Sequence, residues 1–105
     1  MTYEVFITSR AQQEAQANHD WWARHRSAEQ AARWYDKFLK EMLSLEQNPD
    51  RFGLAPENDR FPYMVRQLSF GLGPKPTHRL VYTIRPHDVV VLRVRHLAQQ
   101  DIDPE

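Results

Sequence analysis

Four arginines near the C-terminal end of the chain have the residue type and the spacing to bind an anion. They lie in HRLVYTIRPHDVVVLRVRH, residues 78–96, which predicts a β-hairpin because two runs of branched and aromatic residues flank a Pro-His-Asp break. Alternate residues of a strand share one face, so one face of this hairpin would carry Arg79, Arg85, Arg93 and Arg95. Guanidinium groups gathered so closely repel one another unless an anion or an acidic partner compensates them. This arginine face therefore suits RNA phosphates or an acidic protein surface, and solvated surface arginines are the simpler alternative.

The opposite face of the hairpin is apolar and ends in a histidine. Its predicted core residues are Leu80, Tyr82, Ile84, Val90, Leu92 and Val94, with His96 last in the same register. The predicted apolar floor of the arginine face is Val81, Val89 and Val91. His96 has two interpretations. Its ring could pack under the sheet as a structural residue, or reach round the strand end as an acid or a base, since histidine titrates near neutral pH.

Two helices and two strands are expected before the hairpin, and they must position it. The predicted elements are a strand at 3–8, a helix at 10–25 with Ser9 as N-cap, a helix at about 28–47, and a strand at 64–70. Ser27 and Gln30 form a capping-box pair at the start of the second helix. Because only one or two residues separate the helices, they should form an antiparallel hairpin.

This order of elements predicts a fold class. Strands grouped after helices indicate an α+β domain with a β-α-α-β-β-β order, in which the helical hairpin covers one face of a twisted, largely antiparallel sheet. Trp21, Trp22 and Trp34 are expected to pack the helical hairpin. Nothing else in the chain is expected to cover the arginine face. Residues 48–62 contain three prolines and no periodicity, so they predict a long loop, and such loops are usually functional or mobile.

Length and composition limit the class of protein. A chain of 105 residues is expected to form one domain, 1–105, around a single core. It has no cysteine, so a disulfide framework and a thiolate metal site are excluded, which suits the cytoplasm. No signal peptide or membrane span is predicted. The formal net charge is zero, yet residues 63–100 hold six basic and one acidic side chain, so a local anion-binding surface is compatible with a neutral total.

Several kinds of site are excluded by their spacing. The Gly-Leu-Gly-Pro-Lys stretch at 71–75 lacks the pattern of a phosphate-binding loop, and its prolines remove backbone donors. The five histidines show no metal-ligand spacing, and there is no Gly-x-Ser-x-Gly nucleophile motif. No metal and no cofactor are therefore expected, and the arginine face is the candidate site.

The sequence resembles one known family over nearly its whole length. The order of elements is similar to that of the RelE/ParE superfamily, the toxins of type II toxin-antitoxin or plasmid stabilisation modules. The motifs that carry the resemblance are AARWY at 31–35, Leu-x-x-Asn-Pro at 45–49, VRQLSFG at 65–71, HRLVYTI at 78–84 and VLRVRH at 91–96. The resemblance implies a small cytoplasmic toxin that inhibits growth and is held inactive by a cognate antitoxin, in a toxin-antitoxin hetero-oligomer.

The resemblance also implies two alternative targets. RelE-like toxins are mRNA interferases: they enter the ribosome and cut mRNA as endoribonucleases without a metal. For this activity, the resemblance implies three catalytic residues. Arg79 is similar to the arginine that binds the phosphate in RelE-like toxins, and His96 is similar to the terminal-strand histidine that some of them use as a general acid or base. Glu57 is similar to a loop glutamate that some relatives use as a base. Arg66 would be a secondary phosphate contact, beside Arg85, Arg93 and Arg95 as target-binding residues.

ParE-like toxins instead poison DNA gyrase and are not known as nucleases. The sequence-based prediction is ribosome-dependent mRNA cleavage. Inhibition of gyrase by protein binding is the alternative, favoured by the neutral charge and the incomplete nuclease set. A toxin that has lost its activity and binds only its antitoxin is a third possibility.

Overall fold

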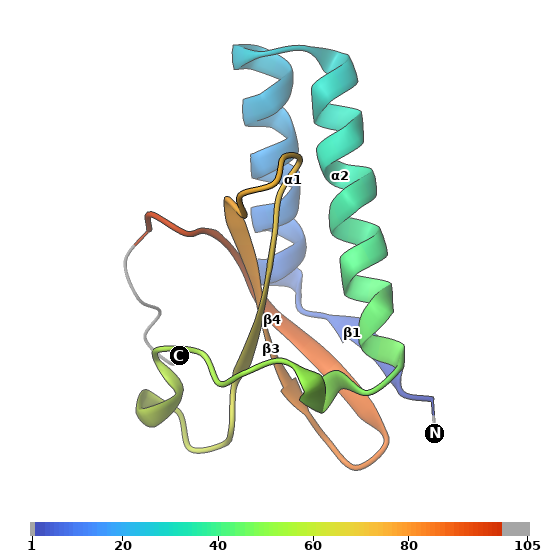
Figure 1. The fold of residues 1–105 in the computed structure, drawn as a ribbon, viewed down its shortest axis with the longest axis vertical. Coiled ribbons are helices and arrows are strands. Elements are labelled where there is room, and N and C mark those ends of the chain that lie inside the picture. Colours follow the sequence, from blue (N-terminus) through green and yellow to red (C-terminus); the bar gives the residue numbers. More distant parts are fainter. Residues whose placement is uncertain (1, 100–105) are drawn as a thin grey trace.

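A helical hairpin lies on one face of a four-stranded sheet in the computed structural model, which describes residues 2–99 (Figure 1). The elements are β1 Glu4–Ile7, α1 Ser9–His25, α2 Ala28–Leu43, β2 Arg66–Phe70, β3 His78–Ile84 and β4 Asp88–His96. The strand order is β1-β4-β3-β2, with β1 parallel to β4 and the other neighbours antiparallel. The predicted α+β class and element order are therefore confirmed.

The start of each helix follows from side-chain capping. The Thr8 hydroxyl accepts a hydrogen bond from the Ala11 N–H at 3.1 Å, so the N-cap of α1 lies one residue before the predicted Ser9. Ser27 caps α2 as predicted, since its hydroxyl accepts from the Gln30 N–H at 3.0 Å. Helix α2 ends at Leu43, and a 3-10 turn at Ser44–Glu46 replaces its predicted last turn.

Aromatic side chains join α2 to the sheet. Trp34 and Phe38 are fully buried and stacked, with ring centroids 5.9 Å apart, and Phe70 of β2 packs against both rings. Trp22 is half-buried against this core. The prediction that Trp21 also packs the helical hairpin is wrong, because 45% of its surface is exposed.

An irregularity between β3 and β4 changes which residues reach the core. Val81 lies opposite Arg93, but the next residue, Tyr82, lies opposite Val91, so Leu92 is an extra residue in β4. A shift of one residue reverses the face of every side chain beyond it. The predicted core residues Val90 and Leu92 therefore lie on the other face, and the predicted floor residues Val89 and Val91 are buried in the core.

Residues 48–62 cover part of the second face of the sheet, contrary to the prediction that nothing covers the arginine face. Leu54 forms a β-bridge with Arg66, and the Ala55 N–H donates to the Val65 carbonyl at 2.9 Å. Ala55 and Val65 then form a small second core with Val81 of β3. None of the helices within residues 2–99 is long and apolar enough to cross a membrane.

Candidate functional site

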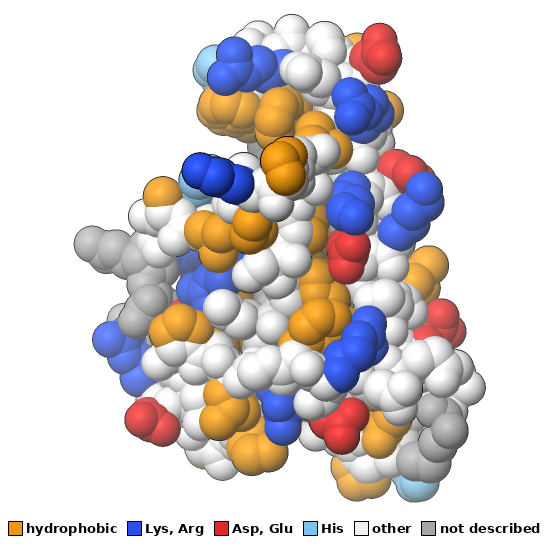
Figure 2. Space-filling model, viewed as in Figure 1, with side chains coloured by type: hydrophobic (Ala, Val, Ile, Leu, Met, Phe, Trp, Pro, Cys, Tyr) orange, Lys and Arg blue, Asp and Glu red, His pale blue; other side chains and the backbone are white. Residues whose placement is uncertain are grey.

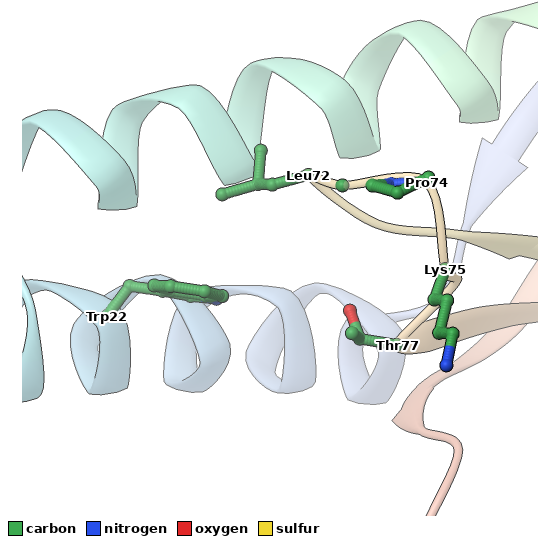
Figure 3. A pocket seen from close by; sticks show the side chains of 6 residues that line it. Trp22, Leu72, Pro74, Lys75 and Thr77 are labelled. Carbon is green, nitrogen blue, oxygen red and sulfur yellow. The ribbon is translucent and has the colours of Figure 1, made fainter.

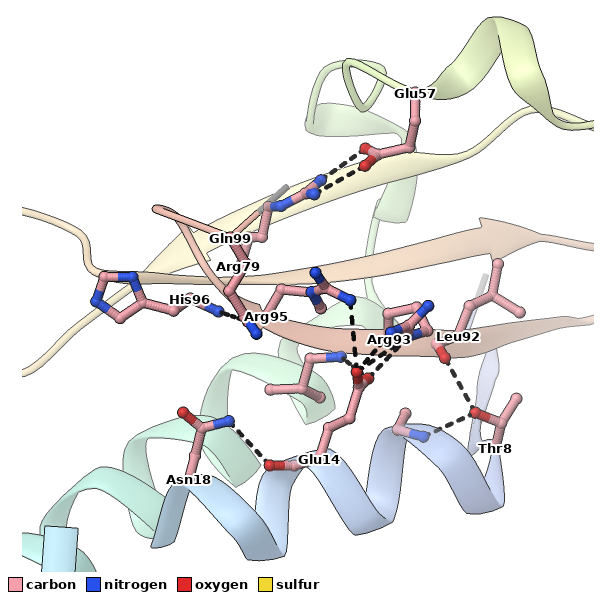
Figure 4. Close-up of polar contacts among 12 residues, drawn as sticks. Thr8, Glu14, Asn18, Glu57, Arg79, Leu92, Arg93, Arg95, His96 and Gln99 are labelled. Carbon is pink, nitrogen blue, oxygen red and sulfur yellow. Dashed lines mark hydrogen bonds and ion pairs between the residues drawn. The ribbon is translucent and has the colours of Figure 1, made fainter. Parts of the chain in front are cut away.

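Arg79 is held by a carboxylate from the covering loop. Its Nη1 lies 2.6 Å from Glu57 Oε1 and its Nη2 lies 2.8 Å from Glu57 Oε2, a two-point contact (Figure 4). Gln67 Oε1 accepts from the same Nη1 at 3.0 Å. Both charged residues are buried, with 4% of Arg79 and 1% of Glu57 exposed. The guanidinium face that would bind a phosphate is therefore occupied by a side chain of the same protein.

The local fold of the loop explains how Glu57 reaches Arg79. The Asn58 amide N–H donates to the Ala55 carbonyl at 3.0 Å, and the Arg60 N–H donates to the Glu57 carbonyl at 2.9 Å. The Asn58 side chain also accepts from the Val65 N–H at 2.8 Å, which ties this turn to the chain entering β2. These bonds satisfy backbone groups of a loop whose regular structure is limited to short 3-10 turns, Asn58–Arg60 among them, and they fix the carboxylate over β3.

Glu14 of α1 compensates the arginines of β4. Arg93 donates to both Glu14 oxygens, with its Nη2 2.7 Å from Oε2, and Arg95 Nη1 lies 3.9 Å from Oε2 (Figure 4). The Val94 N–H also donates to Glu14 Oε1 at 3.0 Å. Burial and then repulsion by Arg93 lower the pKa of Arg95. Glu14 thus compensates the positive charge of the β4 arginines. It also accepts a backbone hydrogen bond at the edge of β4 beyond Val91, where the pairing with β1 ends.

Glu14 is a site residue that the sequence analysis missed. It is the only acidic residue in the first ten residues of α1, and it lies three residues after the buried Ala11. That spacing places Glu14 beside the buried stripe of the helix, which is the signal that could have identified it.

The two remaining candidate arginines lie apart from Arg79. Arg66 is half-buried and donates to the Phe52 carbonyl at 2.6 Å, so it holds the loop against β2. Arg85 is exposed at the tip of the β3-β4 hairpin, where its guanidinium pairs with the Asp88 carboxylate. This pairing raises the pKa of Arg85 and lowers the pKa of Asp88. Neither side chain completes a catalytic group with Arg79.

His96 is exposed at the end of β4, on the other face of the sheet from Arg79. Its ring contacts the His78 ring at 4.9 Å between centroids, whereas the neighbours of these histidines, Arg79 and Arg95, project from the opposite face. The His96 Nδ1 accepts from the Ala98 N–H at 3.0 Å, and its backbone N–H donates to Gln99 Oε1 at 2.8 Å. The structure therefore does not bring Arg79, Glu57 and His96 together as one catalytic group.

His78 is a buried histidine that the sequence analysis assigned no role. Its Nε2 lies 2.9 Å from Asn18 Oδ1, and its Nδ1 lies 2.7 Å from the Thr77 hydroxyl and 3.4 Å from Trp34 Nε1. A neutral ring that donates from Nε2 and accepts at Nδ1 satisfies all these contacts. Burial, with repulsion from His96, lowers the pKa of His78 to about 4. Within residues 2–99, no group of three metal-ligand side chains is close enough to hold a metal ion.

Comparisons with known proteins identify the family. The family model described as the ParE toxin of the type II toxin-antitoxin system parDE matches residues 5–101. A search of curated proteins found no match. Among solved structures, a chain of the chromosomal ParDE toxin-antitoxin system from P. aeruginosa has a similar fold, with a TM-score of 0.73 and 16% sequence identity. The alignment covers 90% of this chain and 96% of that one. The predicted RelE/ParE resemblance is thus confirmed, and the chain belongs to the ParE family of type II toxin-antitoxin toxins.

Proposed function

We propose that this toxin inhibits DNA gyrase by binding it as a protein and does not cut RNA. The family match supports this target, since the ParE-like branch of the superfamily is the one linked to gyrase. The gyrase alternative from the sequence analysis is therefore favoured over ribosome-dependent mRNA cleavage, the sequence-based prediction.

The contact between Glu57 and Arg79 is the observation that carries this proposal. A nuclease needs a cation to stabilise the phosphorane and an acid or base within reach of the same phosphate. Here a buried carboxylate fills the hydrogen-bonding fork of Arg79 at 2.6 and 2.8 Å. Separating such a buried pair costs about 3–5 kcal/mol, which an RNA phosphate would have to repay before any chemistry began.

The second observation is the separation of the candidate groups. His96 projects from the face of the sheet that carries the helices, and Arg79 projects from the face covered by the loop. A single phosphate bound at Arg79 would therefore have no histidine beside it. A conformation able to cut RNA would need both a displaced loop and a rearranged strand end.

An antitoxin is the expected second partner, as in the ParDE system that the fold resembles. We infer that the toxin is held in a hetero-oligomer with a cognate antitoxin and acts in the cytoplasm, where gyrase meets DNA. The arginine face is then a structural unit in which Arg79 fixes the loop and Arg93 fixes the β4 edge. Neither of these residues, nor Arg66 outside that face, is then a target-binding residue.

An in vitro supercoiling assay tests the proposal. Purified toxin should inhibit supercoiling of relaxed plasmid by gyrase and should leave mRNA intact in a translating ribosome extract. Arg79→Met, if folded, should keep the inhibition. Gyrase that stays fully active at high toxin excess, with mRNA cut in the extract, would reject the proposal. Activity in neither assay would identify a toxin that binds only its antitoxin.

A further inference from the structure

A hollow of about 400 Å³ lies between α1 and the end of the sheet, apart from the arginine face. Trp21 and Trp22 of α1 form one side, and His96 and Gln99 at the end of β4 form the other. A second hollow adjoins it across Trp22 and Thr77, and it is lined by the β2-β3 linker. Figure 3 shows Trp22, Leu72 and Lys75 around this second hollow. Together the two hollows form one groove, which we call the tryptophan groove.

Trp21 is the exposed anchor of the tryptophan groove. Its ring meets Trp22 edge to face at 5.6 Å, stacks on His25 at 4.8 Å, and keeps 45% of its surface exposed. The His25 ring is itself fixed by a 3.0 Å contact between its Nδ1 and the Trp21 carbonyl. An exposed tryptophan held rigidly beside a hollow is the residue type that most often dominates a protein interface.

The end of β4 supplies hydrogen-bond donors to the groove. Because His96 Nδ1 accepts from the Ala98 N–H, a neutral His96 ring carries its proton on Nε2. Gln99 uses its side-chain oxygen to accept from the His96 N–H, so its NH2 group is its donor. Two donors beside an apolar wall match a polypeptide segment that presents backbone carbonyls next to an apolar side chain.

The charges around the groove favour an acidic occupant. Lys75 lines it, and Arg24 and Arg26 follow the two tryptophans at the end of α1. Arg33 lies beside Leu72 in a neighbouring hollow that Asp36 also lines, and Asp20 lies near Arg24. Figure 2 shows hydrophobic side chains between Lys and Arg side chains in the upper part of the view, with acidic side chains toward its right edge. In the part of the chain that the structure describes, no acidic side chain lines either hollow. Complementary charge would steer an acidic segment to this surface.

We propose that the tryptophan groove is the surface that docks onto gyrase, and that its occupant is an acidic gyrase segment with an aromatic or branched apolar anchor. This inference rests on the proposed function. It follows because the arginine face is filled by Glu57 and Glu14 of the same chain. The groove instead combines an exposed anchor, side-chain donors at its end, and Lys75 with no acidic side chain of the described residues in its lining.

The test compares two truncations of exposed apolar side chains. Trp21→Ala removes the anchor, and Leu43→Ala removes a side chain of similar exposure, 51% against 45%, at the far end of α2. Half-inhibitory concentrations are measured in the supercoiling assay, with circular dichroism and thermal melting to confirm that both variants fold. Trp21→Ala should weaken inhibition roughly tenfold or more, and Leu43→Ala by less than about twofold. A double charge reversal, Arg24→Glu with Arg26→Glu, should also weaken inhibition, and more at low salt.

Each other outcome overturns the inference in a distinct way. Wild-type toxin that leaves gyrase active removes the proposed function and this docking surface together. Wild-type inhibition that Trp21→Ala retains in full leaves the proposed function standing and removes the groove as its surface. An unaffected double charge reversal contradicts the acidic occupant. A wild-type dimer in sedimentation that Trp21→Ala dissociates would make a second copy of this chain the occupant.

Discussion

Replacing either partner of the buried Arg79–Glu57 pair should destabilise the protein strongly, and replacing both should not. Both side chains are buried, and they share hydrogen bonds of 2.6 and 2.8 Å. Glu57→Leu leaves a buried guanidinium beside the Gln67 side chain, and Arg79→Met leaves a buried carboxylate without its arginine partner. Each single change should therefore cost about 3–5 kcal/mol of the roughly 5–15 kcal/mol that stabilises a small domain.

The double variant separates the cost of losing one partner of the pair from the net value of the pair. Apolar side chains of similar volume need no desolvation, so Glu57→Leu with Arg79→Met should be more stable than either single variant and within about 1–2 kcal/mol of wild type. Urea unfolding followed by tryptophan fluorescence measures all four proteins, and each single variant should shift the midpoint by about 1 M or more. Asp88→Asn, which breaks the exposed Arg85–Asp88 pair, is the control and should leave the midpoint unchanged. Single losses that simply add in the double variant would refute the account of the loop as held by a buried ion pair.

Three further changes test other parts of the structure. The pKa of His78 is about 4 against an ordinary value of 6.5, so the unfolded chain binds more protons than the folded chain between these pH values. The free energy of unfolding should therefore fall as pH drops from about 6.5 to 4, by on the order of 2 kcal/mol after allowing for solvent screening. Urea unfolding at each pH measures this slope, which should flatten in His78→Gln. Glu14→Ala removes the partner of Arg93 and the acceptor of the Val94 N–H, so it should cost about 2–4 kcal/mol and speed amide hydrogen exchange at Val94; unchanged exchange there would contradict the role of Glu14 at the β4 edge. Ser27→Ala removes the cap of α2 and should cost about 0.5–2 kcal/mol in thermal unfolding, while Ser27→Asp should restore most of it.

Periodicity and capping predicted most of the fold because those signals are local. The helix at 28–47 was recognisable from its apolar spacing and from Ser27 with Gln30, and the observed α2 begins at Ala28 as predicted. The extra residue at Leu92 left no comparable mark in VLRVRH, since a bulge is decided by pairing with β3. The alternation rule therefore assigned the wrong face to the residues of β4 that precede it, Val89 and Val91 among them.

The site was predicted less well because it depends on contacts between distant segments. The hairpin pattern correctly placed Arg79 and Arg93 on one face, but their partners Glu57 and Glu14 come from a loop and a helix 22 and 79 residues away. No spacing rule connects such residues. Four arginines on one face indicated that negative charge must meet them, and the source of that charge, the protein's own glutamates, became visible only in the folded chain.

The measurement that tests the central claim most directly is induction of the toxin in cells without an antitoxin, followed within minutes by mapping of mRNA 5′ ends and of plasmid supercoiling. The account predicts intact mRNA together with lost negative supercoiling or broken DNA. New in-frame mRNA ends with normal supercoiling would contradict it and would make Arg79, despite its contact with Glu57, a catalytic residue of a ribosome-dependent nuclease.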